Sequence, residues 1–197
     1  MSVGVESEHW SKTFEGEDFS GEELSSIEFE SCTFIGCNFS EVVFNRCNFI
    51  DCTFLKCNLS MAKMQYSKFS DVVFRDSKAI GVDWSKIAWP RIVFNSPINF
   101  YDCMIDDGSF YGLSLPELVL DSCVARRVDF RNGEFRNANF KHTNFSSALF
   151  SETNLSGTDF TSATDFDIDI FNNNLKRAKF DRFEAMRLLG SLEIELV

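Results

Sequence analysis

A large apolar residue recurs at every fifth position through most of this sequence. The first register comprises Phe14, Phe19, Leu24, Phe29, Phe34, Phe39, Phe44, Phe49, Phe54, Leu59, Met64, Phe69, Phe74, Ala79, Trp84, Trp89 and Phe94. A second register, displaced by one residue somewhere in 95–99, runs from Phe100 to Phe160 and fades through Asp165, Ile170, Leu175 and Phe180. A period of five matches neither a helix of about 3.6 residues per turn nor the alternation of a strand. The chain must therefore turn every few residues.

A second, smaller class of inward-facing residue stands two positions before each large one. All seven cysteines occupy this position: Cys32, Cys37, Cys47, Cys52, Cys57, Cys103 and Cys123. We expect these thiols to pack as compact, mostly apolar fillers beside the phenyl rings. A metal site fits the pattern poorly, because the cysteines form no C-x-x-C pair and only His9 and His142 are available as imidazole ligands. The sequence therefore predicts no metal, no cofactor and no catalytic residue.

Individual repeats resemble those of a known family. Examples are Cys37-Asn38-Phe39-Ser40-Glu41, Ala138-Asn139-Phe140-Lys141-His142 and Thr153-Asn154-Leu155-Ser156-Gly157, which are similar to the A(D/N)LxX consensus of pentapeptide-repeat proteins. The resemblance implies an all-β fold, a right-handed quadrilateral β-helix of about eight coils stacked at the ~4.8 Å spacing of paired strands. The expected divisions are an N-terminal extension or cap at 1–13, the β-helix at 14–180 and a capping and dimerisation segment at 181–197.

The C-terminal residues favour a short helix followed by a strand. Asp181 is placed to act as the helix N-cap, with Glu184 three residues later, and Gly190 is placed to end the helix. The residues that we expect to form a homodimer interface are Phe183, Met186 and Leu189 on one helix face, and Leu192, Ile194 and Leu196 on the alternating strand. A monomer that uses this segment only as a cap is the alternative.

The charge of the chain points to a basic protein partner. The formal net charge is −11, which disfavours direct binding to nucleic acid or to a membrane surface. Between His142 and Leu175 there is no Lys or Arg, and this interval supplies the predicted partner-binding acidic patch: Glu152, Asp159, Asp165, Asp167 and Asp169. The sequence shows no secretory signal and no apolar run of membrane-spanning length, so we expect a cytoplasmic protein.

Within the family, the sequence is most similar to the topoisomerase-protecting group, which includes the quinolone-resistance (Qnr) proteins, and there to the albicidin-resistance protein. The similarity rests on Gly81-Val82-Asp83-Trp84, on Ala88-Trp89-Pro90 and on the stretch from Ile168 to Leu196. It implies a non-enzymatic dimeric rod that imitates B-form DNA, binds DNA gyrase or topoisomerase IV and counters a poison of that enzyme. The single register slip favours the loop-free toxin-resistance type, although an insertion of five residues would leave the period unchanged. An interaction scaffold with a different protein partner is the alternative function.

Overall fold

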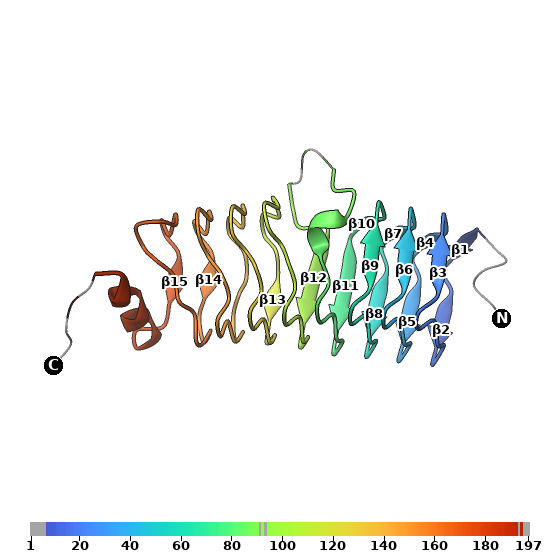
Figure 1. The fold of residues 1–197 in the computed structure, drawn as a ribbon, viewed down its shortest axis with the longest axis horizontal. Coiled ribbons are helices and arrows are strands. Elements are labelled where there is room, and N and C mark those ends of the chain that lie inside the picture. The colour runs from blue at the N-terminus through green and yellow to red at the C-terminus, as the bar shows by residue number, and fades with distance from the viewer. Residues whose placement is uncertain (1–6, 91, 93, 193, 195–197) are drawn as a thin grey trace.

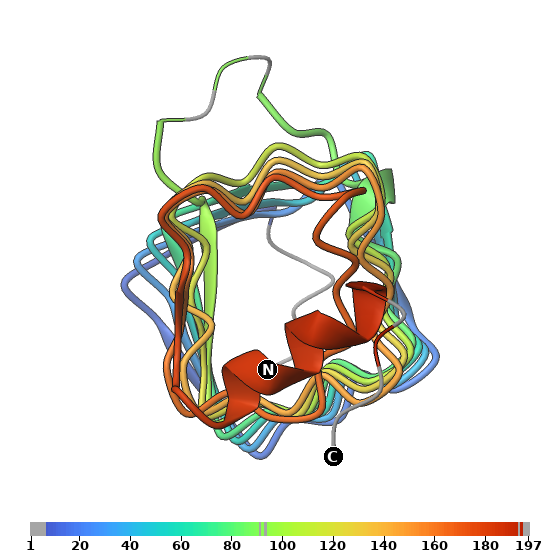
Figure 2. The same cartoon turned by 90° about the vertical axis from the view of Figure 1, so that its left-hand side faces the viewer.

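The protein is a straight rod of stacked square coils, with the two ends of the chain at opposite ends of the rod (Figure 1). The computed structural model describes residues 7–90, 92, 94–192 and 194. A view along the axis shows four sides around a common interior (Figure 2). The expected β-helix of five-residue repeats is confirmed, with about nine turns where about eight were predicted.

Parallel strands two to four residues long line the sides of the rod. The first side contains β1 (Glu8–Trp10), β4 (Glu28–Glu30), β7 (Asn48–Ile50) and β10 (Lys68–Ser70). The second contains β2 (Thr13–Glu15), β5 (Thr33–Ile35), β8 (Thr53–Leu55), β11 (Val72–Arg75), β12 (Ile98–Tyr101) and β13 (Leu120–Asp121), and β14 (Asp159–Phe160) and β15 (Lys179–Phe180) extend it. The third contains β3 (Glu23–Ser25), β6 (Val43–Asn45) and β9 (Lys63–Gln65). Isolated parallel bridges join the coils on the fourth side, beginning with Asp18 and Asn38. Because β1 pairs with β4, and the Ser7 carbonyl accepts the N–H of Glu28, the stacked coils include residues before the expected boundary at residue 14.

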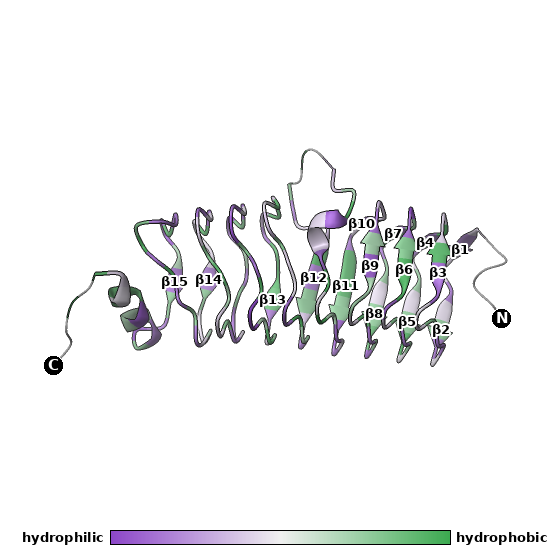
Figure 3. Cartoon of the chain, in the orientation of Figure 1, coloured by the Kyte–Doolittle hydropathy of each residue, from purple (hydrophilic) through white to green (hydrophobic). Residues whose placement is uncertain are grey.

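The core is a set of aromatic stacks that run along the rod axis. Residues 20 positions apart pair in register, so Phe34, Phe54 and Phe74 lie directly above one another. Their ring centroids are 4.7 and 4.9 Å apart, and all three rings are buried. Hydrophobic residues recur along the coils in Figure 3, with hydrophilic residues between them. Each coil thus buries its rings against the rings of its neighbours, which is how a repeat protein builds a continuous core.

The corners explain the abundance of Asn, Asp, Ser and Gly. The residue two positions after most of the large ones adopts a left-handed backbone conformation, with φ of 58° at Glu41 and 50° at Asp51. Short polar residues tolerate this region because they bond to nearby backbone. Asn38, three residues before Glu41, stabilises the same corner, because its Oδ1 accepts a hydrogen bond from the backbone N–H of Ser40 at 3.1 Å. Each five-residue repeat therefore forms one side of the square coil, as a short strand or bridge, together with the corner that leads to the next side.

The register slip is a loop, so the one-residue interpretation is wrong. Lys78 pairs with Met104, 26 positions later, whereas the regular spacing is 20. The six additional residues lie between Ala88, whose N–H bonds to the preceding coil, and Pro97, whose carbonyl accepts from Val72. This loop projects from the middle of the rod (Figures 1 and 2). Phe94, expected inside, is 84% exposed because it belongs to the loop.

The C-terminal cap also differs from prediction. It is the 3₁₀-helix η3 (Glu184–Leu192), which contains Gly190 and extends through Leu192. The carboxylate of Asp181 does not cap this helix but accepts the backbone N–H of Ser162 in the coil below, at 2.6 Å. Ile194 lies outside any regular element, and Leu196 lies outside the described residues.

The last coil departs from the repeat as well. Phe166 and Ile168 are buried in place of Asp165 and Ile170. Among the described residues, no helix has both the length and the apolar character needed to cross a membrane.

Candidate protein-binding surface

The five residues of the predicted acidic patch surround the C-terminal coils and do not share one side. Asp159 begins β14 on the second side. Asp165 lies beside Asn144 of the fourth side, and Glu152 occupies a corner with φ of 53°. Asp167 and Asp169 are exposed on the irregular stretch that follows. The structure therefore presents these carboxylates as a collar around the rod.

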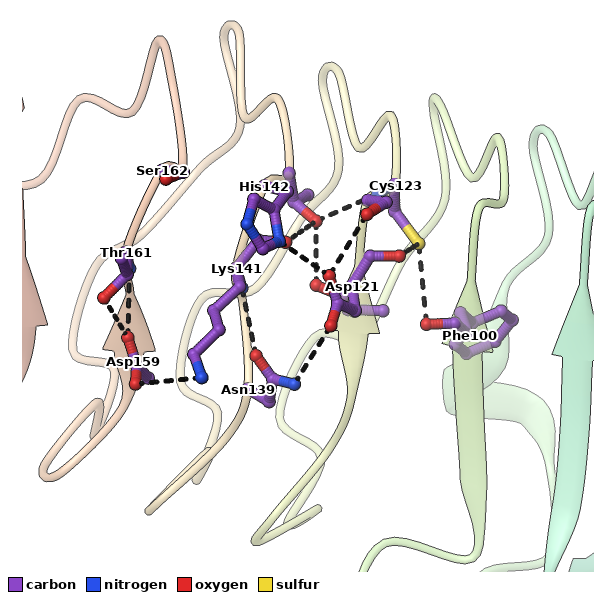
Figure 4. Close-up of polar contacts among 12 residues, drawn as sticks. Phe100, Asp121, Cys123, Asn139, Lys141, His142, Asp159, Thr161 and Ser162 are labelled. Carbon is purple, nitrogen blue, oxygen red and sulfur yellow. Dashed lines mark hydrogen bonds and ion pairs between the residues drawn. The ribbon is translucent and has the colours of Figure 1, made fainter.

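Neighbouring coils supply the cations that the acidic interval lacks in sequence. Asp159 Oδ2 lies 3.5 Å from the Nζ of Lys141 and 3.4 Å from the Nζ of Lys179. Thr161 donates its backbone N–H and its hydroxyl to Asp159 at 3.0 and 2.6 Å. Figure 4 shows Lys141 from the adjacent coil and Thr161 from the same coil converging on this carboxylate. Asp165 is likewise 3.2 Å from the Nη2 of Arg187.

These contacts determine the protonation of Asp159. Partial burial by itself would raise the pKa of its carboxyl, but the hydrogen bonds from Thr161 and the charges of Lys141 and Lys179 outweigh that effect. The resulting pKa is about 2, so Asp159 is ionised at any pH near neutrality.

Two members of the patch keep free carboxylates. Within the described part of the chain, Glu152 and Asp167 form no side-chain hydrogen bond and no ion pair. Asp169 accepts only the backbone N–H of Phe171, at 2.8 Å. Glu152 and Asp167 are therefore the best placed of the five to attract a basic partner.

The N-terminal coil carries more unpaired negative charge than the predicted patch. Residues 7–30 include eight Asp and Glu and one basic residue, Lys12. None of the ion pairs between described residues involves those eight carboxylates. Glu8 even lies directly opposite Glu28, an arrangement that costs stability. The acidic excess here is visible in the sequence, but the small number of its ion pairs with other described residues becomes apparent only in the folded coil.

The central coils show how charges cancel at a spacing of 20 residues. Asp106 and Asp107 pair with Arg126 and Arg127 of the next coil, each at 2.6 Å. The carboxylate of Asp106 is almost fully buried beneath Arg126. If each charged residue had been compared with the residues 20 positions before and after it in the sequence, such ion pairs between coils could have been distinguished from unpaired charges.

The residues proposed for dimerisation leave an apolar surface at the C-terminal end. Phe183 and Met186 on η3 are 82% and 51% exposed, and Leu192 and Ile194 are also exposed. Leu189 is partly buried. Leu188, which the sequence pattern did not select, packs against the core. The helix therefore turns Leu188 inward and presents Phe183 and Met186 outward.

The cysteines are buried, as expected, but they do more than fill space. The Sγ of Cys52 donates a hydrogen bond to the carbonyl of Phe29 in the preceding coil at 3.3 Å. Ser67 and Thr143 occupy the same position of other repeats and donate in the same way, at 3.0 and 2.7 Å. Among the described residues, no group of three or more potential ligands is arranged to hold a metal ion.

Comparison with known proteins identifies the family. The profile for a pentapeptide repeat region matches residues 27–98, and that for pentapeptide repeats matches residues 126–162. The chain belongs to the pentapeptide-repeat proteins. Comparison of the sequence with curated proteins gives no match.

Two solved structures support the fold over nearly the whole chain. Full-length QnrB1, a plasmid-mediated fluoroquinolone resistance protein, superposes with a TM-score of 0.52 and 21% identity, covering 95% of this chain and 100% of QnrB1. A trypsin-treated QnrB1 variant gives a TM-score of 0.50 and 23% identity, with 96% and 99% coverage. At this identity the likeness establishes a shared architecture, and function must be argued from the surface.

Proposed function

We propose that this pentapeptide-repeat protein binds DNA gyrase or topoisomerase IV at its DNA-binding surface. It would thereby protect that enzyme from a quinolone-like or albicidin-like poison. The observation that carries the proposal is an acidic rod with the architecture of a fluoroquinolone resistance protein. The proposed role is binding alone, so it requires no catalytic group and no cofactor.

The charge of the rod supports imitation of duplex DNA. A net charge of −11 spread over about nine turns of ~4.8 Å each gives about one net charge per ~4 Å. Duplex DNA carries one charge per ~1.7 Å. The rod therefore has somewhat less than half the charge density of DNA. A groove lined with Lys and Arg for phosphate binding would attract such a rod, and the attraction would weaken as salt increases.

A homodimer through the C-terminal segment would extend the rod to the length of a longer duplex. Phe183 and Met186 supply exposed apolar surface at that end of the rod, and burial of such surface favours association. In this arrangement the collar of Glu152, Asp159, Asp165, Asp167 and Asp169 would lie on both sides of the dimer centre. The strongly acidic N-terminal coils would form the two outer ends.

The proposal is tested with purified gyrase and topoisomerase IV in supercoiling, decatenation and DNA-cleavage assays. Addition of the protein should reduce the cleavage complex trapped by a quinolone or by albicidin while the enzyme continues to turn over DNA. If micromolar protein has no effect on supercoiling, decatenation, cleavage or DNA binding, the topoisomerase assignment is wrong. An interaction scaffold for another partner then becomes the better explanation.

A further inference from the structure

A cavity of about 550 Å³ opens on the third side of the rod, between β9 and the 3₁₀-helix η2 (Trp84–Lys86). The sheet of this side ends at β9, because the next coil forms η2 where a strand would be expected. Asp83 stabilises the start of η2, since its Oδ1 accepts the backbone N–H of Ser85 at 3.0 Å. The sequence thus encodes an interruption of the ladder, and the cavity occupies the space beside it.

The walls of this cavity are apolar. Met61 and Tyr66 line it and remain 56% and 67% exposed, whereas most large apolar residues of the rod are buried. Gly81 also lines the cavity. A Cβ atom at residue 81 would lie only 2.5 Å from the Sδ of Met61, so glycine allows Met61 to lie across this coil. A thioether and an aromatic ring facing one space form a favourable environment for a flat apolar group.

The rim of the cavity is positively charged, whereas the protein as a whole is acidic. Lys63 and Lys86 line it, and the guanidinium carbon of Arg46 lies 5.7 Å from the centre of the Tyr66 ring. Asp83 is the one acidic residue of the lining, and its carboxylate is 3.7 Å from Lys86 Nζ. The lining therefore contains two cations and one anion on a chain of net charge −11, and Arg46 lies against the Tyr66 ring beside it. Such a local positive field favours an anionic ligand.

We propose that this cavity binds a small aromatic molecule that carries a carboxylate. The ring lies between Met61 and Tyr66, and the carboxylate contacts Lys63 and Lys86. The volume falls within the ~300–1,000 Å³ typical of sites for drug-sized ligands, and a pocket of that size is mostly apolar with a few polar groups. The same volume is too small for the surface of a folded partner. This binding does not depend on the proposed interaction with a topoisomerase.

The experiment uses the full chain with ¹³C-labelled methionine methyl groups. Met61 and Met64 line the cavity, while Met104 and Met186 lie elsewhere on the rod and serve as internal references. Titration with 1-naphthoate should shift the Met61 and Met64 methyl signals and leave the other two unchanged. The neutral analogue 1-naphthamide should bind more weakly, because it cannot pair with the lysines.

Two lysine variants complete the test. Lys63→Gln combined with Lys86→Gln should raise the naphthoate Kd about fivefold, as expected for loss of two exposed charge contacts. Lys68→Gln is the matched control, because Lys68 begins β10 at the same repeat position and with the same burial pattern as Lys63 in β9. Its Kd should remain that of the wild type.

Three results would overturn the proposal. The first is absence of shifts at millimolar naphthoate, and the second is equal binding of naphthoate and naphthamide with no effect of the double variant. The third is a shift of the Met61 and Met64 signals with a capped Leu-Phe-Glu peptide but not with naphthoate, which would assign the cavity to a peptide.

Discussion

At the residue scale, the small inward position combines packing with hydrogen bonding. Five-residue spacing predicts that Cys52 lies inside the rod, and the structure confirms it. The thiol hydrogen bond to a carbonyl of the preceding coil could not be predicted from the five-residue spacing, because it depends on how closely the thiol approaches the backbone of the neighbouring coil. This hydrogen bond explains why Ser and Thr replace Cys in other coils.

The hydrogen-bonding role of the thiol predicts a difference between two substitutions of Cys52. Cys52→Val keeps an apolar side chain of the kind that Val72 supplies at the same repeat position, but it removes the thiol's hydrogen bond to the Phe29 carbonyl, so it should lower the free energy of unfolding by about 1 kcal/mol. Cys52→Ser keeps a donor and should cost less. Denaturant unfolding measures both. Equal stability of the valine variant and the wild type would show that the thiols are apolar fillers only.

The lowered pKa of Asp159 predicts that the stability of the fold depends on pH. Its pKa falls from an ordinary 3.8 to about 2 in the folded chain, so its ionised form stabilises the fold at pH values above about 4. That contribution disappears as the pH falls from about 4 to 2, because the folded protein then binds the proton. Solvent screening limits it to less than about 1 kcal/mol.

Asp159→Asn should therefore be less stable than the wild type at pH 7 and equally stable near pH 2. Paired thermal unfolding at both pH values measures the difference, and Glu41→Gln, at an exposed corner, is the control. A gap that persists unchanged at pH 2 would contradict the role of the ionised carboxylate.

At the element scale, the repeats were predictable and their interruptions were not. The regular spacing identifies the inward residues from Phe14 to Trp84, because the large residue of each repeat points into the core of the rod. An insertion of one repeat plus one residue preserves most of that spacing, so the loop before Pro97 was indistinguishable from a slip. The C-terminal cap was mistaken in detail because Asp181 bonds to the coil below it, a tertiary contact that no helix-capping rule contains.

Because the loop adds six residues to one coil, we expect six residues of this segment to be dispensable for the fold. Deletion of 90–95 should restore the 20-residue spacing across the junction and change the free energy of unfolding by less than about 1 kcal/mol, since surface loops tolerate length changes. Circular dichroism and denaturant unfolding measure this. Deletion of six residues from regular coils, 130–135, is the contrasting variant and should abolish cooperative unfolding. If both deletions are equally harmful, the loop is part of the core structure.

At the scale of the whole molecule, the exposed apolar end predicts self-association. Phe183→Glu combined with Met186→Glu should convert a dimer into a monomer, because it places charge in the proposed interface. Sedimentation equilibrium measures the molecular mass. Phe94→Glu, which alters an equally exposed aromatic residue in the central loop, is the control and should remain dimeric. A wild-type protein that is monomeric at all concentrations would contradict the dimer.

The distribution of charge along the rod is also a property of the whole molecule. The sequence correctly indicates an acidic chain, but only the stacked coils show that Asp159 and Asp165 are neutralised by basic neighbours. Such pairing depends on which coil follows which. The contact surface for a basic partner was therefore harder to predict than the fold.

Competition between this protein and duplex DNA for gyrase tests the central claim most directly. Fluorescence anisotropy of the labelled protein should show binding to gyrase that duplex DNA displaces, with an affinity that falls steeply as salt rises from about 50 to 200 mM. Simultaneous binding of DNA and protein without mutual effect, or an affinity independent of salt, would contradict duplex imitation.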